Sequence, residues 1–316
     1  MDIVVVNSFG PMGSTPVGSL IEKFGFLNLP VRKLGLHDYL VGERSIEDPY
    51  MVGRILENLT HHNAPLKQGG INVLDRDSAS PRQLVDKSRV EADIQELKQT
   101  RFDSVAHMYH SVKSIYAKAV SYKEIDGIPE RHIEYTTDLI YHSPEELYQD
   151  YKAHFDNVYM IHIHRDFVSW MNSLASQAFA HTKIKHRFKP MLIGRRLGTY
   201  TRYKEVVNGI PGLHLNFEEL FLPDTLSVVG KIGNYLGMDI PELDWNRETF
   251  DLYGKLTSFE KAFTLMDDHI NYLSPVTQRY ILKATKGKIR SYETLGIGLM
   301  YLIDGIRFQF SHRNSR

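Results

Sequence analysis

The sequence contains no cysteine among its 316 residues. This absence excludes disulfide bridges, thiolate nucleophiles and metal centres with sulfur ligands, and it fits a reducing compartment. An excess of one charge is also lacking, because 38 lysines and arginines are matched by 38 aspartates and glutamates. A chain without net charge is not suited to wholesale electrostatic capture by nucleic acid, so we expect no nucleic-acid partner.

Long apolar runs are missing as well. The run at residues 3–6 is short and follows an acidic residue, whereas a signal peptide needs a basic start and a longer apolar core. No segment approaches the roughly 20 apolar residues that a membrane span requires. We therefore predict a cytoplasmic protein without a membrane span.

The residues that are present have the balance of a globular protein, with 42% hydrophobic and 24% charged residues. The β-branched run at residues 3–6 predicts a strand that is buried on both faces. A turn-rich stretch, residues 7–15, follows it. A helix is predicted next, with Thr15 as its N-cap, Pro16 in its first position and Gly25 at its end.

Two similar units follow later in the chain. Residues 158–163 predict a second buried strand, and Asp166 is the expected cap of a helix that begins near Ser169. Residues 213–217 alternate like a strand, and a helix is predicted at 225–236. Strands that alternate with helices predict a three-layer α/β fold with a parallel sheet and flanking helices.

The middle section, at about residues 45–130, has polar and helical character without a strong strand. Helices are predicted at 90–98 and 104–122. We interpret this section as a helical insertion in a single domain that covers residues 1–316.

The first turn is a candidate anion site. Gly10 and Gly13 permit a close approach of the backbone, and Ser14 and Thr15 supply hydroxyl groups. Amide groups at the start of a helix favour a bound anion. An ordinary tight turn between a strand and a helix would have the same composition.

A Walker A motif is a second interpretation of this turn. Gly13 and Gly18 have the required spacing, but Ser19 and Leu20 stand where the lysine and the hydroxyl residue belong. A kinase or nucleotide triphosphatase would therefore lack two of its chemical requirements.

The second turn places a basic residue at the end of a predicted strand, where open parallel sheets bind ligands. Arg165 has that position, and Ser173 lies eight residues later, about two helical turns away. A guanidinium and a hydroxyl suit a phosphate group. The alternative is a surface pair between Arg165 and Asp166 with an unrelated serine.

Three segments together resemble the sulfotransferase family: PMGSTP in the first turn, HIHRDFVSWMNS in the second unit, and HLNFEELFLPDTLSVVGKIGNYLG in the third. The resemblance covers residues 3–22 and about 156–237, and YETLGI at 292–297 is a weaker echo. It implies 3′-phosphoadenylyl sulfate (PAPS) as the sulfuryl donor. Arg165 and Ser173 would then bind the 3′-phosphate.

The first turn would hold the 5′-phosphosulfate through Gly10, Pro11, Met12, Gly13, Ser14, Thr15 and Pro16. The family normally has a lysine or arginine in this turn, and here Pro11 or Met12 occupies its place. A basic residue would then have to come from Arg32, Lys33 or the acid-free basic run at 183–204, or sulfuryl transfer would be weak or absent. That run would close over the phosphates or attract an anionic acceptor, unless it is a solvated helix face.

The resemblance also implies a general base in the window that contains His37 and Asp38, although a solvated polar pair would look the same. His107 and His110 are second candidates, and their helical spacing also suits simple packing. No metal is expected, because His162 and His164 have no obvious third ligand.

The function predicted from the sequence is transfer of a sulfuryl group from PAPS to a hydroxyl of a carbohydrate or another small acceptor. Two alternatives remain open at this point. One is a catalytically silent protein that binds a nucleotide or a saccharide on the same scaffold. The other is a P-loop-like kinase that acts on a small molecule.

Overall fold

The structure is a computed structural model, and it describes residues 1–9, 12–29, 34–61, 67–68, 71–72, 86–119, 127–136, 143–180, 193–221, 225–242, 248–250, 256–258, 272–285, 296 and 298–307.

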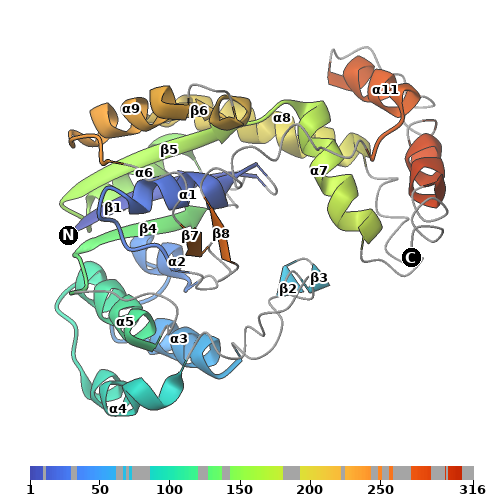
Figure 1. Ribbon diagram of the computed structural model, residues 1–316. Helices are drawn as coiled ribbons and strands as arrows, with labels where there is room; N and C mark the ends of the chain where they lie inside the picture. The colour runs from blue at the N-terminus through green and yellow to red at the C-terminus, as the bar shows by residue number, and fades with distance from the viewer. Residues whose placement is uncertain are drawn as a thin grey trace.

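A parallel sheet of four strands forms the centre of the fold (Figure 1). Its order is β4-β1-β5-β6, with bounds Arg131–Thr136, Asp2–Asn7, Asn157–His164 and Leu213–Asn216. The β-branched residues 3–6 of β1 are fully buried, as expected for a strand in the middle of a covered sheet. All four strands run in one direction, so their carboxyl ends lie along the same edge.

Helices cover both faces of this sheet. One face carries α1 and α9, and the other carries α5 and α6, with bounds Ser14–Glu22, Thr225–Leu236, Val105–Ala119 and Pro144–Lys152. Tyr235 of α9 packs on Tyr159 with ring centroids 5.9 Å apart, and Tyr109 of α5 packs on His132 at 5.5 Å. The strand register places Tyr159 and His132 on opposite faces. The predicted three-layer α/β fold is therefore confirmed.

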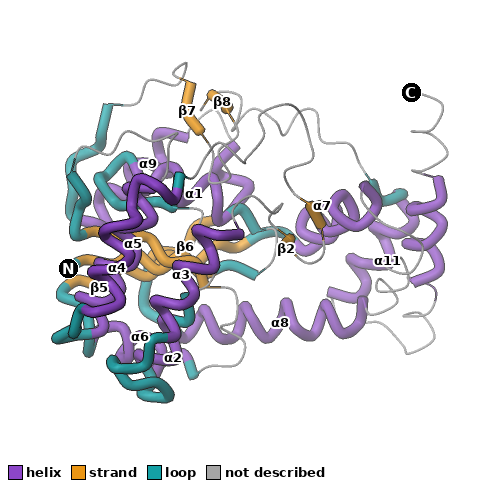
Figure 2. The backbone as a smooth tube through the Cα atoms, turned by 90° about the horizontal axis from the view of Figure 1, so that it is seen from below, coloured by secondary structure: helices purple, strands orange, loops and turns teal. Residues whose placement is uncertain are grey.

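The remaining helices form two groups (Figure 1). Near β4 are α2, α3, the 3-10 helix η2 and α4, with bounds Leu36–Leu40, Tyr50–His61, Lys87–Val90 and Glu91–Gln99. Beyond the carboxyl ends of the strands are α7, α8 and α11, with bounds Phe167–Ala180, Ile193–Gly209 and Pro275–Thr285. Figure 2 shows that α8 extends between the sheet and α11.

Shorter elements and a helical stretch at residues 298–307 complete the described chain. A 3-10 helix, η6, covers Phe217–Phe221 directly after β6. Two small antiparallel hairpins, β2–β3 and β7–β8, have bounds Lys67–Gln68, Ile71–Asn72, Glu248–Phe250 and Leu256–Ser258. Within the described ranges, every helix is too short or too polar to cross a bilayer.

Most predicted elements are confirmed. The strands expected at 3–6 and 158–163 are β1 and β5, and the helix expected at 225–236 is α9 with the same bounds. The helices expected in the middle section are α4 and α5, and α5 packs directly on the sheet. The division into one domain with an insertion stays a prediction.

Three details differ from the prediction. The first helix begins at Ser14, because Gly13 rather than Thr15 is its N-cap. The strand β6 ends at Asn216, and Phe217 starts η6 instead of continuing the strand. Strand β4 was not predicted, although its sequence RHIEYT alternates polar with apolar residues as a half-buried strand does.

Candidate functional site

The structure brings the two predicted turns together at one edge of the sheet. Strands β1 and β5 are neighbours, and Asn7 at the end of β1 pairs with His162 near the end of β5. The turn that precedes α1 and the turn that contains Arg165 therefore leave adjacent strands at their carboxyl ends. This edge is where open α/β sheets bind their ligands. Gly10 and Pro11 lie outside the described residues.

The first turn offers backbone donors. Gly13 has φ +96° and forms the N-cap of α1 without a hydrogen bond from a side chain. The first amide N–H groups of α1 have no partner inside the helix, which is the condition for binding an anion there. The hydroxyl of Ser8 is fully buried and has no hydrogen-bond partner among the described residues.

Individual side chains of this turn have different roles. Met12 is fully buried, and its sulfur accepts a hydrogen bond from the Phe9 N–H at 3.3 Å, so its side chain belongs to the core. Ser14 is half-buried at the first position of α1, and Pro16 stands two residues later in the same turn of helix. Thr15 is placed in α1, but its side chain lies outside the described parts. Among the described side chains of residues 12–16, Ser14 therefore supplies a hydroxyl beside the backbone donors at the start of α1.

Arg165 is held from two sides. Its Nε donates a hydrogen bond to Ser169 Oγ at 2.9 Å, and its guanidinium lies 3.9 Å from the centroid of the Phe217 ring. The residue is only 4% exposed, and this burial lowers the pKa of the guanidinium to about 10, although Glu218 and Asp166 oppose the shift. Arg165 therefore keeps its positive charge at neutral pH.

The helix α7 supplies the hydroxyl that contacts this arginine, that of Ser169, and carries Ser173 further along. Ser169 lies four residues after Arg165, and Ser173 follows one turn later and is half-buried. Ser173 was predicted as a site residue and Ser169 was not, although helical spacing places both on one face of α7. The carboxylate of Asp166 accepts hydrogen bonds from the N–H groups of Val168 (2.8 Å) and Ser169 (3.1 Å), so the predicted cap is confirmed.

Phe217 connects the two turns. A Cβ atom added to Gly13 would lie 2.1 Å from Cδ2 of Phe217, and the same ring stacks on Arg165. The ring therefore touches both the backbone of the first turn and the guanidinium of the second. An anion between the turns would have Phe217 as its apolar neighbour. Phe217 was not predicted as a site residue, because its alternation with Leu213 and Leu215 predicts a strand position.

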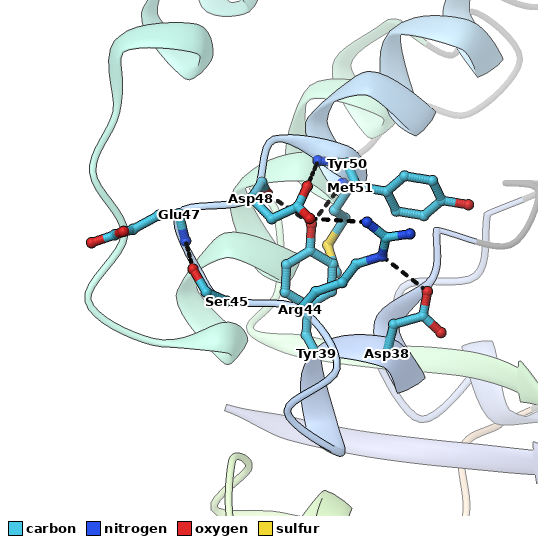
Figure 3. Close-up of polar contacts among 8 residues, drawn as sticks. All are labelled: Asp38, Tyr39, Arg44, Ser45, Glu47, Asp48, Tyr50 and Met51. Atoms are coloured by element: carbon cyan, nitrogen blue, oxygen red, sulfur yellow. Dashed lines mark hydrogen bonds and ion pairs between the residues drawn. The ribbon is translucent and has the colours of Figure 1, made fainter.

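The candidate base Asp38 is engaged in a local network (Figure 3). Its Oδ2 accepts from Arg44 Nε at 3.1 Å, and Arg44 Nη1 also donates to Asp48 at 2.9 Å. The guanidinium of Arg44 lies 3.9 Å from the centroid of the Tyr50 ring. These contacts fix the loop between α2 and α3. His37 is half-buried on the same short helix, and its role as a base stays a prediction.

The second pair of candidate bases has structural partners. His110 Nδ1 lies 2.9 Å from Nε2 of the buried His132, so the two imidazoles share a hydrogen bond under the sheet. His107 is exposed, with Asp103 at 3.9 Å and the Phe102 ring edge-on at 5.7 Å. His110 thus has a packing role against His132, and the role of either histidine as a base stays a prediction.

The basic run is described only in part. Residues 181–192, Arg32 and Lys33 lie outside the described residues. In α8, Arg202 is exposed with Glu205 at 3.8 Å, and Lys204 lies 5.2 Å from the centroid of the Tyr200 ring. Whether this run reaches a ligand stays a prediction.

Three histidines lie side by side on β5 and β6. His164 Nε2 is 2.7 Å from His214 Nδ1, and the rings of His162 and His214 are 4.8 Å apart. Asn7 Nδ2 lies 3.0 Å from His162 Nδ1, which places that nitrogen as the acceptor. In the described parts of the chain, no group of three or more potential ligands is arranged to hold a metal ion.

Burial of the His162 imidazole predicts a loss of stability in acid. Desolvation lowers the pKa of His162 from 6.5 to about 4, so the folded protein binds this proton less readily than the unfolded chain. Above pH 6.5 the neutral His162 adds its full contribution to the free energy of unfolding. As the pH falls from 6.5 to 4, this contribution is lost, and the loss amounts to about 3 kcal/mol at 1.36 kcal/mol per pH unit. Urea titrations between pH 6.5 and 4 should show that the free energy of unfolding falls less steeply with pH in His162→Asn than in wild type. The exposed control His107→Asn should follow wild type, and equal curves for all three proteins would contradict the assignment.

Comparison with known proteins finds similarity in structure but not in sequence. No family model matches the chain, and no curated protein matches it in sequence. Among solved structures, the sulfotransferase domain from the Synechococcus PCC 7002 olefin synthase aligns with 95% of this chain and 94% of its own, at 13% identity and a TM-score of 0.42. Similarity at this level leaves the function to be inferred from the residues of the chain.

Proposed function

We propose that this protein is a sulfotransferase that moves a sulfuryl group from PAPS to a hydroxyl of a carbohydrate or another small acceptor. The observation that carries the proposal is the pairing of β1 with β5, which sets the Gly13 turn beside Arg165. Two anionic groups of one nucleotide can then be bound by adjacent turns. The spacing of Arg165 and Ser173, which prompted the resemblance, lies in the second of these turns.

The donors at this edge fit a nucleotide with two anionic ends. The start of α1 and the buried Ser8 hydroxyl would bind the 5′-phosphosulfate. Arg165 and Ser173 would bind the 3′-phosphate, and we add Ser169, which already orients the guanidinium.

The reaction would be an in-line displacement, in which these residues position the groups and stabilise the developing charge. The acceptor oxygen attacks sulfur, the bond from sulfur to the bridging phosphate oxygen breaks, and adenosine bisphosphate leaves. The acceptor proton passes to a base. His37 and Asp38 are both candidates for this base, and Asp38 would have to exchange its hydrogen bond from Arg44 to act.

The kinase alternative loses support from the packing around Gly18. A Cβ atom at this position would lie 1.8 Å from the Tyr135 hydroxyl, so a glycine is needed there for close packing. The G-x-x-x-x-G spacing thus has an explanation without a Walker motif. One observation favours a catalytically silent binding protein. Met12, which can align with the family's basic residue, has a buried apolar side chain and supplies no positive charge.

Calorimetry with 3′,5′-adenosine bisphosphate, compared with ATP and Mg²⁺, tests the proposal. Arg165→Ala should weaken bisphosphate binding by about 1.5–3 kcal/mol, because a charge-assisted hydrogen bond is lost. The surface variant Arg101→Ala is the control and should bind as wild type does. Binding that does not depend on Arg165, or a preference for ATP, would overturn the proposal. Binding without turnover of PAPS against a panel of hydroxyl acceptors would favour the silent protein.

A further inference from the structure

A tyrosine hydroxyl from α8 joins the ends of the two strands that lead into the site. Tyr203 Oη lies 2.8 Å from the carbonyl oxygen of Asn7 and 3.0 Å from that of Ile163. Asn7 is the last residue of β1, and Ile163 is the second last of β5. The contacts therefore lie immediately before the two turns.

Further donors reach the backbone of the turns themselves. The hydroxyl of Tyr200 donates to the carbonyl oxygen of Arg165, and Trp170 Nε1 donates to that of Phe9 at 2.8 Å. The Phe9 ring stacks on Trp170 at 5.4 Å and on Tyr203 at 6.0 Å. Phe167 packs on Trp170 and Tyr200 at 5.5 Å and 4.9 Å. We call these five residues, Phe9, Phe167, Trp170, Tyr200 and Tyr203, the aromatic clamp.

The chemistry of Tyr203 makes its contacts sensitive to distance. A hydroxyl carries one proton, so Tyr203 shares it between two carbonyl oxygens or donates to one of them. Both oxygens stay within hydrogen-bond range only while the ends of β1 and β5 keep their present separation. Burial raises the pKa of Tyr203 well above its usual range, so the hydroxyl remains a neutral donor.

We propose that Tyr203, supported by Tyr200, is a positioning residue that sets the distance between the Gly13 turn and Arg165. The inference rests on the proposed function and deepens it. With the distance fixed, the site selects ligands that carry two anionic groups at the separation of a nucleoside 3′,5′-bisphosphate. A ligand with one phosphate occupies one turn and does not depend on this distance.

Tyr203→Phe is the test, because it removes one hydroxyl and keeps the ring in the clamp. Calorimetry should show binding of 3′,5′-adenosine bisphosphate weakened at least tenfold, and binding of 5′-AMP and 3′-AMP changed less than twofold. The matched control is Tyr235→Phe, which also removes a hydroxyl bonded to the backbone of β5, here the Met160 N–H at 3.1 Å on the other face. The control should bind all three nucleotides as wild type does.

The outcomes separate this inference from the function on which it rests. Equal weakening of all three nucleotides, or unchanged bisphosphate binding, overturns the positioning role while the proposed function stands. If the wild type does not bind the bisphosphate, both the proposed function and the preference for ligands with two anionic groups are wrong. Hydrogen exchange then still decides the positioning role: Tyr203→Phe should speed exchange in residues 8–13 and 164–167, and unchanged exchange refutes it.

Discussion

The Lys113→Met variant is expected to lose about 3–5 kcal/mol of unfolding free energy, because it removes one partner of a buried ion pair. Lys113 is 3% exposed on α5, and its Nζ donates to the carbonyl oxygen of Ile133 at 2.7 Å and lies 3.6 Å from Glu134 Oε2. Tyr109 also donates its hydroxyl to Glu134. Methionine keeps the apolar length of the side chain, so the loss reports the uncompensated carboxylate rather than a cavity.

Urea unfolding followed by circular dichroism measures this effect. The double variant Lys113→Met with Glu134→Gln removes both charges and should recover much of the loss. Lys118→Met is the matched control on the same helix, because Lys118 is half exposed and pairs with Asp93 at 3.1 Å. A surface pair contributes about 0–1 kcal/mol. The prediction is wrong if the two single variants lose the same stability.

Strand β4 was missed although its local pattern is that of a strand, and only the burial of its polar face depends on this distant pair. His132 and Glu134 alternate with Ile133 and Tyr135, which is the pattern of a strand with a solvated face. In the structure that face packs on α5, where Lys113 and Tyr109 supply the polar partners. Those partners lie about twenty residues away in sequence, so no local pattern announces them.

Elements with a strong local signal were predicted well. The buried strands β1 and β5 follow from β-branched runs, and α9 follows from its periodicity between Pro223 and Gly237. The helix cap at Asp166 is equally local.

The residues of the candidate site follow the same rule: those with a local sequence signal were predictable, and those brought in by packing were not. The sequence indicates Arg165 and Ser173 because they lie eight positions apart, about two helical turns, and Ser169 could have been found from the same spacing. Phe217 and Tyr203 reach the turns from η6 and α8, and these contacts depend on how distant elements pack. No spacing within one element predicts such contacts.

Gly13→Ala is expected to destabilise the protein by about 2–5 kcal/mol and to weaken binding of 3′,5′-adenosine bisphosphate more than tenfold. Two costs combine. A side chain at φ +96° is strained, and the new Cβ would lie 2.1 Å from Cδ2 of Phe217. Strain of this kind costs about 1–2 kcal/mol and overpacking about 1–3 kcal/mol. Binding suffers because Phe217 must move away from Arg165.

A control separates the two costs. Gly237 has φ +67° at the end of α9, and nothing lies within 4 Å of its added Cβ, so Gly237→Ala reports the strain alone. The stability that Gly13→Ala loses beyond Gly237→Ala is then due to the clash with Phe217. Adding Phe217→Ala to Gly13→Ala should remove this excess loss, while the backbone strain at residue 13 remains. If Gly13→Ala loses no more than Gly237→Ala, then Phe217 does not press on the first turn. The ring would then no longer connect the Gly13 turn to Arg165, and the two turns would have to act on a ligand independently.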